Sequence, residues 1–268
     1  MLDLAKALDF FHYLRMVGGT GFAFILFGMG GLFLNGIILL IGWFPFPSQK
    51  IKEGVVQKVL YYAFRGFMFY LQGFNLIHSK AIGMEKLPKS GGYILVANHP
   101  TLLDVVLILA HLPRAYCIVK PEILNSIYMS GVSRLAGYIA NTDGEKLIEK
   151  CIEKLKQGFP LVIFPEGTRS LPNEIGKFKR SAAWIALKSG FPIVTSVVRC
   201  SELILMKQWR WFDLPPHSIE LSFTIYDTIN PNDFSESKAG DAIHARRLTA
   251  YLKRFYEGTL NYASYPRT

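Results

Sequence analysis

The sequence predicts an α/β fold in which a central mixed, mostly parallel sheet is flanked by helices and preceded by N-terminal membrane-binding helices. Three observations support this prediction. No residue from Met16 to Gln49 carries a charge. From about Ser79 onward, short apolar segments alternate with amphipathic ones, as strands alternate with helices in α/β domains. Two of the apolar segments also run directly into chemically reactive residues. We therefore expect a membrane anchor with an interfacial helix at residues 1–78 and an α/β domain at residues 79–268.

The composition of the 268-residue chain excludes several classes of protein. Half of the residues are apolar, only 19% are charged and the mean hydropathy is +0.23, which excludes a disordered chain. The three cysteines are odd in number and far apart, so we expect neither a disulfide scaffold nor a metal site. A net charge of +10 beside a positive hydropathy indicates a membrane surface. No nucleic-acid-binding motif accompanies the charge, so we expect no nucleic-acid partner.

The uncharged run forms the first element. As a helix, Met16–Phe44 would span roughly 43 Å, which exceeds the roughly 30 Å of a bilayer's hydrocarbon core. The run is rich in glycine and contains the polar Asn35. A tilted or kinked crossing and a re-entrant hairpin are both compatible with this pattern. The run is too long for a cleaved signal peptide and lacks a clear cleavage site.

The second element is expected at Val55–Ile77. This segment is apolar almost all round, except that Lys58, Arg65 and Gln72 recur every seven residues and so share one helical stripe. Its many aromatic side chains suit a helix lying in the membrane interface; a buried core helix with one wet edge is the alternative. Basic residues are denser after the uncharged run than before it. The positive-inside rule therefore places the rest of the chain on the cytoplasmic face of the inner or plasma membrane.

The remaining elements follow from short apolar runs and helical stripes. The expected strands are Tyr93–Ala97, Ala115–Val119, Leu161–Phe164, Ile193–Val198 and Ser218–Ile225. The expected helices are Gly144–Gln157, Phe178–Ser189 and His244–Tyr256. Reactive groups in such sheets gather where strands end, which directs attention to the residues that follow the first and third of these strands.

The first of these junctions reads V-A-N-H-P-T-L-L-D and ends at Asp104. Pro100 suits the first turn of a helix that His99 would cap. On one continuous helix, His99 and Asp104 would point about 140° apart, but a histidine outside the helix could meet a carboxylate in its first turn. A carboxylate that holds the ring makes histidine a better general base. The alternative is that His99 only caps the helix while Asp104 complements its dipole.

The second junction reads L-V-I-F-P-E-G-T-R-S and ends at Ser170. Gly167 allows a ligand to approach the backbone closely, and Arg169 offers a planar fork of donors for phosphate or carboxylate. Lys179 and Arg180 lie where a helix N-terminus should disfavour cations, and Lys120 directly follows a strand. These cations are candidate contacts for an anionic ligand; solvated surface lysines are the alternative.

Together, the two junctions resemble the glycerolipid acyltransferases, the lysophosphatidic acid acyltransferase family. N-H-P-T-L-L-D matches that family's H-x4-D block, and F-P-E-G-T-R matches a second block residue for residue. Leu135–Ile139 and Phe191–Val194 fit two weaker blocks. The resemblance covers roughly Gly83 to Val198, in the expected order.

The resemblance implies acyl transfer without a covalent enzyme intermediate. His99, oriented by Asp104, would take the proton of a lysophospholipid hydroxyl as it attacks an acyl thioester. The acceptor and its phosphate would be positioned by Glu166, Gly167, Thr168 and Arg169. The implied partners are membrane lipids and an acyl donor, either acyl-CoA or acyl carrier protein, with no further cofactor. The absence of a G-x-S-x-G elbow is consistent with this reading and argues against a serine hydrolase.

One departure from the family pattern concerns the acceptor. Many members carry an arginine that contacts the acceptor phosphate where this chain has Asp143. An acid there would repel a phosphate, so a different hydroxy-lipid is an alternative acceptor. A non-catalytic lipid-binding protein is the alternative from another class, although binding alone would need no general base.

Overall fold

The computed structural model describes residues 2–126, 129–142, 144–170, 175–202, 210, 212–235 and 240–260, with side chains from residue 9 onward. The α-helices are α1 Leu2–Trp43, α2 Gln49–Gly73, α3 Asp104–Leu109, α4 Pro121–Asn125, α5 Ser130–Leu135, α6 Glu145–Lys156, α7 Ser181–Ser189 and α8 Asp241–Leu260. The strands are β1 Ile77–Ile82, β2 Ile94–Ala97, β3 Tyr116–Val119, β4 Ile139–Ala140, β5 Leu161–Ile163, β6 Ile193–Cys200 and β7 Ile219–Ile229. Short 3₁₀ helices lie at Met84–Lys86 and Pro231–Phe234.

The strands form one seven-stranded sheet in the order β1-β7-β6-β2-β5-β3-β4. All neighbours pair in parallel except β6 and β7, so β1 and β7 run against the other five strands. The expected mixed, mostly parallel sheet is confirmed. The predicted boundary between residues 78 and 79 falls inside β1, and the division into two domains stays a prediction.

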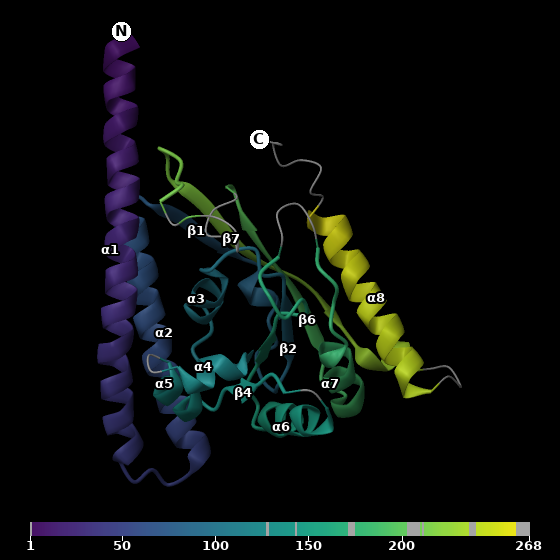
Figure 1. Cartoon of the computed structure of the whole chain (residues 1–268). Helices are drawn as coiled ribbons and strands as arrows, with labels where there is room; N and C mark the ends of the chain where they lie inside the picture. The colour runs from purple at the N-terminus through teal and green to yellow at the C-terminus, as the bar shows by residue number, and fades with distance from the viewer. Residues whose placement is uncertain are drawn as a thin grey trace.

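The sheet is buried on both faces, which explains why its central strands read as continuous apolar runs. In β2, Leu95 and Ala97 pack on the face covered by α1, α2 and α3, whereas Ile94 and Val96 pack on the face covered by α6, α7 and α8 (Figure 1). The alternation follows from the two-residue period of a strand. The sheet edge where β2 and β5 end is therefore held from both sides.

Two short strands were not predicted from the sequence. β1 is an edge strand in which only Ile77 is buried, so its residues carry a weak apolar signal. The helix expected to reach Ile77 instead ends at Gly73, and Asn75 adopts a left-handed backbone conformation with φ 53°. β4 has two residues, too few for a periodic pattern.

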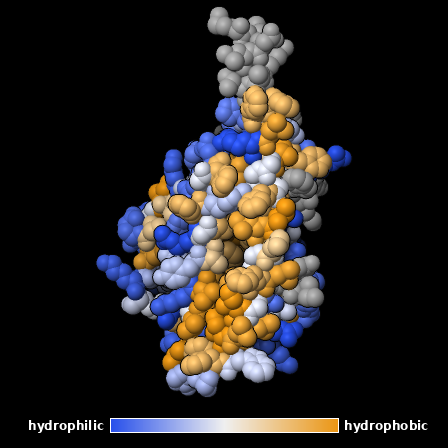
Figure 2. Space-filling model, turned by 90° about the vertical axis from the view of Figure 1, so that its left-hand side faces the viewer, coloured by the Kyte–Doolittle hydropathy of each residue, from blue (hydrophilic) through white to orange (hydrophobic). Residues whose placement is uncertain are grey.

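Residues 16–43 of the uncharged run lie within one uninterrupted helix, α1, which excludes a re-entrant hairpin inside this stretch. Among the described residues, Asp9–Trp43 is the one helical stretch whose length and composition would allow it to cross a membrane, and little of it is buried. A broad apolar band follows α1 along the surface that Figure 2 shows. This exposed helix indicates membrane association.

One face of α1 nevertheless packs on the rest of the protein. The Asn35 Oδ1 accepts a hydrogen bond from the backbone N–H of Val132, in the first turn of α5, at 3.1 Å. A Cβ atom at Gly19 would lie 2.7 Å from Leu76, and one at Gly42 would lie 2.9 Å from Leu135. The polar residue and two of the glycines in the run therefore fit α1 to the domain.

Helix α2 has one buried face and one exposed face, so it combines the buried core helix and the interfacial helix that were the two alternatives predicted from the sequence. Ser48 caps its N-terminus by accepting the backbone N–H of Ile51, so the helix begins at Gln49 rather than at Val55. Val56, Leu60, Met68 and Leu71 are buried, whereas the predicted polar stripe Lys58, Arg65 and Gln72 is exposed. One face is thus a core face and the opposite face is free to meet solvent or membrane.

Candidate active site

A histidine–carboxylate pair lies at the carboxyl end of β2. The His99 Nδ1 lies 2.8 Å from the Asp104 Oδ2, and the Asp104 side chain is fully buried while that of His99 is 17% exposed. Because Asp104 accepts this bond, His99 carries its proton on Nδ1. The other ring nitrogen, Nε2, is then the one available to a ligand. The expected geometry, with His99 outside the helix and Asp104 in its first turn, is present.

Asp104 is held by two further hydrogen bonds. Its Oδ2 accepts the backbone N–H of Thr101 at 2.8 Å, and its Oδ1 accepts the Thr101 hydroxyl at 2.6 Å. These donors offset the cost of burying the carboxylate. They also correct one expectation, because they hold residues 101–104 in a turn. The helix therefore begins at Asp104 with Leu103 as its N-cap, and His99 caps nothing.

The second junction folds onto the first because β2 and β5 are neighbouring parallel strands whose carboxyl ends meet. The backbone N–H of Ser170 donates to the His99 carbonyl at 2.7 Å. Gly167 has a φ of 68°, which favours glycine at this turn. The Phe164 ring stacks on the His99 ring with 4.5 Å between centroids. The chain after β5 therefore helps to fix both the backbone and the ring of His99.

The expected helix at Phe178 begins only at Ser181. The backbone N–H of Lys179 donates to the Pro165 carbonyl at 2.7 Å, which holds the preceding residues against the second junction. This contact places the Lys179 side chain beside the active-site loop: a Cβ atom at Gly167 would lie 3.0 Å from the Lys179 Cε.

A cavity of about 420 Å³ brings most of the predicted site residues together. Its polar part includes the predicted site residues His99, Lys120, Gly167, Thr168, Arg169 and Lys179. Its apolar part comes from α2, α3, β3 and α5. A positively charged end beside an apolar wall suits an amphipathic ligand with an anionic headgroup.

Two predicted binding residues do not line this cavity. Glu166 and Arg180 line a neighbouring open cavity of about 870 Å³. The Glu166 carboxylate is buried and accepts the Ser170 hydroxyl at 2.6 Å and the backbone N–H of Gly176 at 3.0 Å. Glu166 therefore holds the loop that carries Arg169. Asp143, on which the alternative acceptor depended, lies outside the described residues.

Several residues that support the site were missed from the sequence. Asn98 forms two 2.8 Å hydrogen bonds with the backbone of Val198, one in each direction, and so ties the end of β2 to β6. Its position directly before His99 was the available signal. Leu60 and Phe64 of α2 line the cavity from far away in the sequence, and no local pattern marks them.

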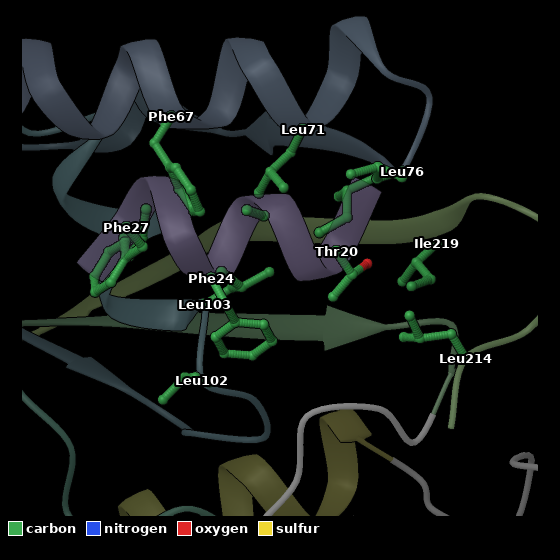
Figure 3. A pocket seen from close by; sticks show the side chains of 13 residues that line it. Thr20, Phe24, Phe27, Phe67, Leu71, Leu76, Leu102, Leu103, Leu214 and Ile219 are labelled. Atoms are coloured by element: carbon green, nitrogen blue, oxygen red, sulfur yellow. The ribbon is translucent and has the colours of Figure 1, made fainter. Parts of the chain in front are cut away.

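A third, smaller cavity of about 120 Å³ lies between α1, α2 and the start of α3 (Figure 3). Its lining is almost wholly apolar and includes Phe24, Phe27, Phe67 and Leu71. Leu102 lines both this cavity and the one that contains His99. This small cavity, next to the one that contains His99, is therefore suited to a hydrocarbon chain.

All three cysteines are buried and are expected to react slowly. Burial raises the pKa of Cys117, Cys151 and Cys200 to about 12 each, so the reactive thiolate is scarce at neutral pH. We expect the native protein to keep its activity in iodoacetamide at neutral pH, whereas all three thiols should react after unfolding in urea. Mass spectrometry of both samples measures the modification. Rapid alkylation of native Cys117, which lines the active-site cavity, would contradict this expectation.

Comparison with known proteins finds similarity to acyltransferases. A family model described as Acyltransferase matches residues 78–199. A 1-acyl-sn-glycerol-3-phosphate acyltransferase of Helicobacter pylori is 28% identical over 188 residues, which cover 66% of this chain and 76% of that protein. The chloroplastic enzyme BAT2 of Brassica napus, with the same activity in its name, is 34% identical over 119 residues, covering 42% of this chain and 34% of its own length.

A solved structure shares the fold. The crystal structure of the 1-acyl-sn-glycerophosphate acyltransferase PlsC from Thermotoga maritima aligns with a TM-score of 0.69 and 21% identity, covering 95% of this chain and 98% of that one. The family model and the relatives named for this activity show an enzyme that transfers acyl groups. The chain is similar to the glycerolipid acyltransferases, and its strand-end histidine–carboxylate pair lies within the residues that the family model matches.

Proposed function

We propose that the protein transfers a fatty acyl group from an acyl thioester to the hydroxyl of a lysophospholipid, with 1-acylglycerol-3-phosphate as the acceptor. The observation that carries the proposal is the 2.8 Å contact between the His99 Nδ1 and the buried Asp104, at the wall of a cavity that also contains Arg169. The relatives named for this activity support the choice of acceptor.

In this reaction the His99 Nε2 removes the proton from the acceptor hydroxyl. The hydroxyl oxygen attacks the thioester carbonyl carbon and forms a tetrahedral intermediate. The C–S bond then breaks, and the departing thiolate takes the proton back from the His99 imidazolium. Asp104 stabilises the imidazolium between the two steps through its bond to Nδ1. The products are the diacylated lipid and the free thiol of the donor.

Three cations indicate where the acceptor phosphate would bind. Arg169, Lys120 and Lys179 share the cavity with His99 and would bind the acceptor phosphate. Gly167 and Thr168 line the same wall and would let the glycerol backbone approach the reactive nitrogen. Glu166 and Arg180 would not line the acceptor site directly. Glu166 would hold the loop that carries Arg169, and Arg180 would act from the neighbouring cavity.

The proposed donor is acyl-CoA or acyl carrier protein, since both present the acyl group as a thioester, and no other cofactor is needed. The proposed location is the cytoplasmic face of the inner or plasma membrane. Positive charge favours this side: basic residues follow the apolar part of α1 more densely than they precede it. Both donors occur on that side of the membrane.

The test is acyl transfer by the purified protein in vesicles, with lysophosphatidic acid compared against neutral and zwitterionic lysolipids. We expect phosphatidic acid to be the main product, measured by lipid mass spectrometry. A preference for another lysolipid would contradict the proposed acceptor and favour the alternative raised by Asp143. An absence of acylated product with every acceptor and both donors would contradict the proposed reaction.

Replacing Arg169 with alanine should weaken binding of the acceptor more than it slows the acyl-transfer step. Removing a charged donor to phosphate should raise the KM for lysophosphatidic acid by about ten- to a hundredfold while kcat changes less. Arg246→Ala is the matched control, because Arg246 is an exposed arginine on α8, on the other side of the sheet. An unchanged KM in the Arg169 variant would remove this residue from the acceptor site.

A further inference from the structure

A groove runs between α1 and α2, with a volume of about 410 Å³. We call it the α1–α2 groove. Its walls are apolar side chains of the two helices, and its base is closed by Met129 and Val132. Three glycines complete the lining: Gly30 and Gly31 on α1 and Gly66 on α2. None of the described residues that line it is charged, so its natural occupant is hydrocarbon.

The glycines keep the groove open. A Cβ atom at Gly30, Gly31 or Gly66 would meet nothing within 4 Å. By contrast, Gly19 and Gly42 on the same helix α1 are packed so tightly against the domain that a Cβ atom would clash. The groove glycines are therefore not needed for close helix packing. The absence of their side chains leaves space instead.

The groove adjoins the active-site cavity. Leu60, Phe64, Met129 and Val132 line both spaces. An acyl chain in the groove would therefore be separated from the cavity that contains His99 only by these apolar side chains. The charged end of that cavity includes Arg169 and Lys179.

The groove also reaches the surface that the membrane would cover. Phe33 lines the groove and is 73% exposed. Phe33 belongs to the exposed apolar surface of α1, together with Met29 and Leu40. The groove therefore joins a surface suited to lipid chains to a cavity suited to a lipid headgroup.

We propose that the α1–α2 groove is a lateral portal and binding site for the acyl chain of the acceptor lysolipid. The chain enters between the two helices from the bilayer and stays in the groove while the headgroup and hydroxyl occupy the cavity beside His99. The lipid then need not leave the hydrophobic phase to react. This proposal rests on the proposed function and specifies how its acceptor is held.

The activity test fills the groove at glycines where an added Cβ atom meets nothing within 4 Å. Gly30→Leu, Gly31→Leu and Gly66→Leu add a side chain to open space and favour helix formation. The matched control is Gly28→Leu, because Gly28 lies on the same helix with the same free space but outside the groove. Each variant is assayed with a long-chain lysophosphatidic acid in vesicles and with a short-chain, water-soluble analogue.

We expect the groove variants to lower kcat/KM for the long-chain acceptor by about tenfold and to stay within about twofold of the original protein on the short-chain analogue. The Gly28 variant should match the original protein on both. Groove variants with undiminished long-chain activity would overturn the portal. An equal loss on both acceptors in a protein with an unchanged unfolding midpoint would also overturn it, since the groove would then have no chain-specific role.

A crosslinking test measures binding of the lipid chain in the groove without requiring catalysis. Lysophosphatidic acid with a photoreactive diazirine in its acyl chain is irradiated in vesicles with the intact protein and with the His99→Ala variant. We expect labelled peptides from α1 near Gly31 and from α2 near Gly66 in both, and reduced labelling in Gly31→Leu. Labelling confined to other parts of the chain would overturn the portal. If the original protein is labelled at the groove but yields no product, the proposed function fails and the binding site stands.

Discussion

Replacing His99 with alanine is expected to lower kcat by about 10²- to 10⁴-fold, because the acceptor hydroxyl would lose the base that we propose removes its proton. Asp104→Asn should lower kcat through His99, since an amide stabilises the imidazolium less well than the carboxylate 2.8 Å from Nδ1 does. The measurement is acyl transfer in vesicles with saturating donor and acceptor.

The control for this prediction is His217→Ala. His217 is an exposed histidine that contacts the Glu202 carboxylate at 3.1 Å and does not line the cavity. It therefore has the same residue type and a carboxylate partner without access to substrate. We expect this variant to turn over like the original protein. Equal product from the His99 variant and the original protein would refute the assignment of the base.

Replacing Glu53 with alanine is expected to cost about 3–5 kcal/mol of unfolding free energy. The Glu53 carboxylate on α2 is 2% exposed, and both of its oxygens lie 2.7 Å from the Lys154 Nζ on α6. The Tyr116 hydroxyl donates to it at 2.9 Å. Burial, followed by the bond to Glu53, raises the pKa of Tyr116, so the phenol remains a donor. Removing Glu53 would leave Lys154, whose side chain is only 15% exposed, as a cation without its counter-charge.

Urea unfolding at neutral pH measures the Glu53 effect. Combining Glu53→Ala with Lys154→Met should recover part of the lost stability, because the second change removes the uncompensated charge. Glu220→Ala is the control, since the Glu220 contact with Lys80 is exposed on both sides and is worth at most about 1 kcal/mol. A Glu53 variant as stable as the Glu220 variant would show that the pair does not secure α2 to the domain.

Much of the α/β domain could be predicted because its signals are local. Leu161–Ile163 and Ile193–Cys200 are apolar runs bounded by turn residues, and α6 carries a helical stripe that ends before Gly158. The strand-end position of His99 also follows from local order. Its contact with Asp104 was predicted as one of two alternatives, because a spacing of five residues is compatible with contact only if a turn precedes the helix.

The start of the helices was predicted less well. α7 begins at Ser181 rather than Phe178 because the Lys179 backbone bonds to Pro165, which is distant in sequence. α3 begins at Asp104 because its carboxylate binds Thr101. In both cases a specific hydrogen bond competes with the helix for the same backbone, and hydropathy carries no information about such bonds.

By itself, the sequence determined the class of fold, the apolar N-terminal segment and the two strand-end motifs, since each depends on neighbours along the chain. Only the tertiary structure decided that Asn35 meets α5, that Glu53 meets Lys154, and that Glu166 supports a loop instead of lining the His99 cavity. It also decided which glycines of α1 pack tightly against the domain, namely Gly19 and Gly42, and which leave open space in the α1–α2 groove, namely Gly30 and Gly31. Packing across the sheet and between helices joins residues far apart in sequence, and such contacts leave no periodic trace in either partner.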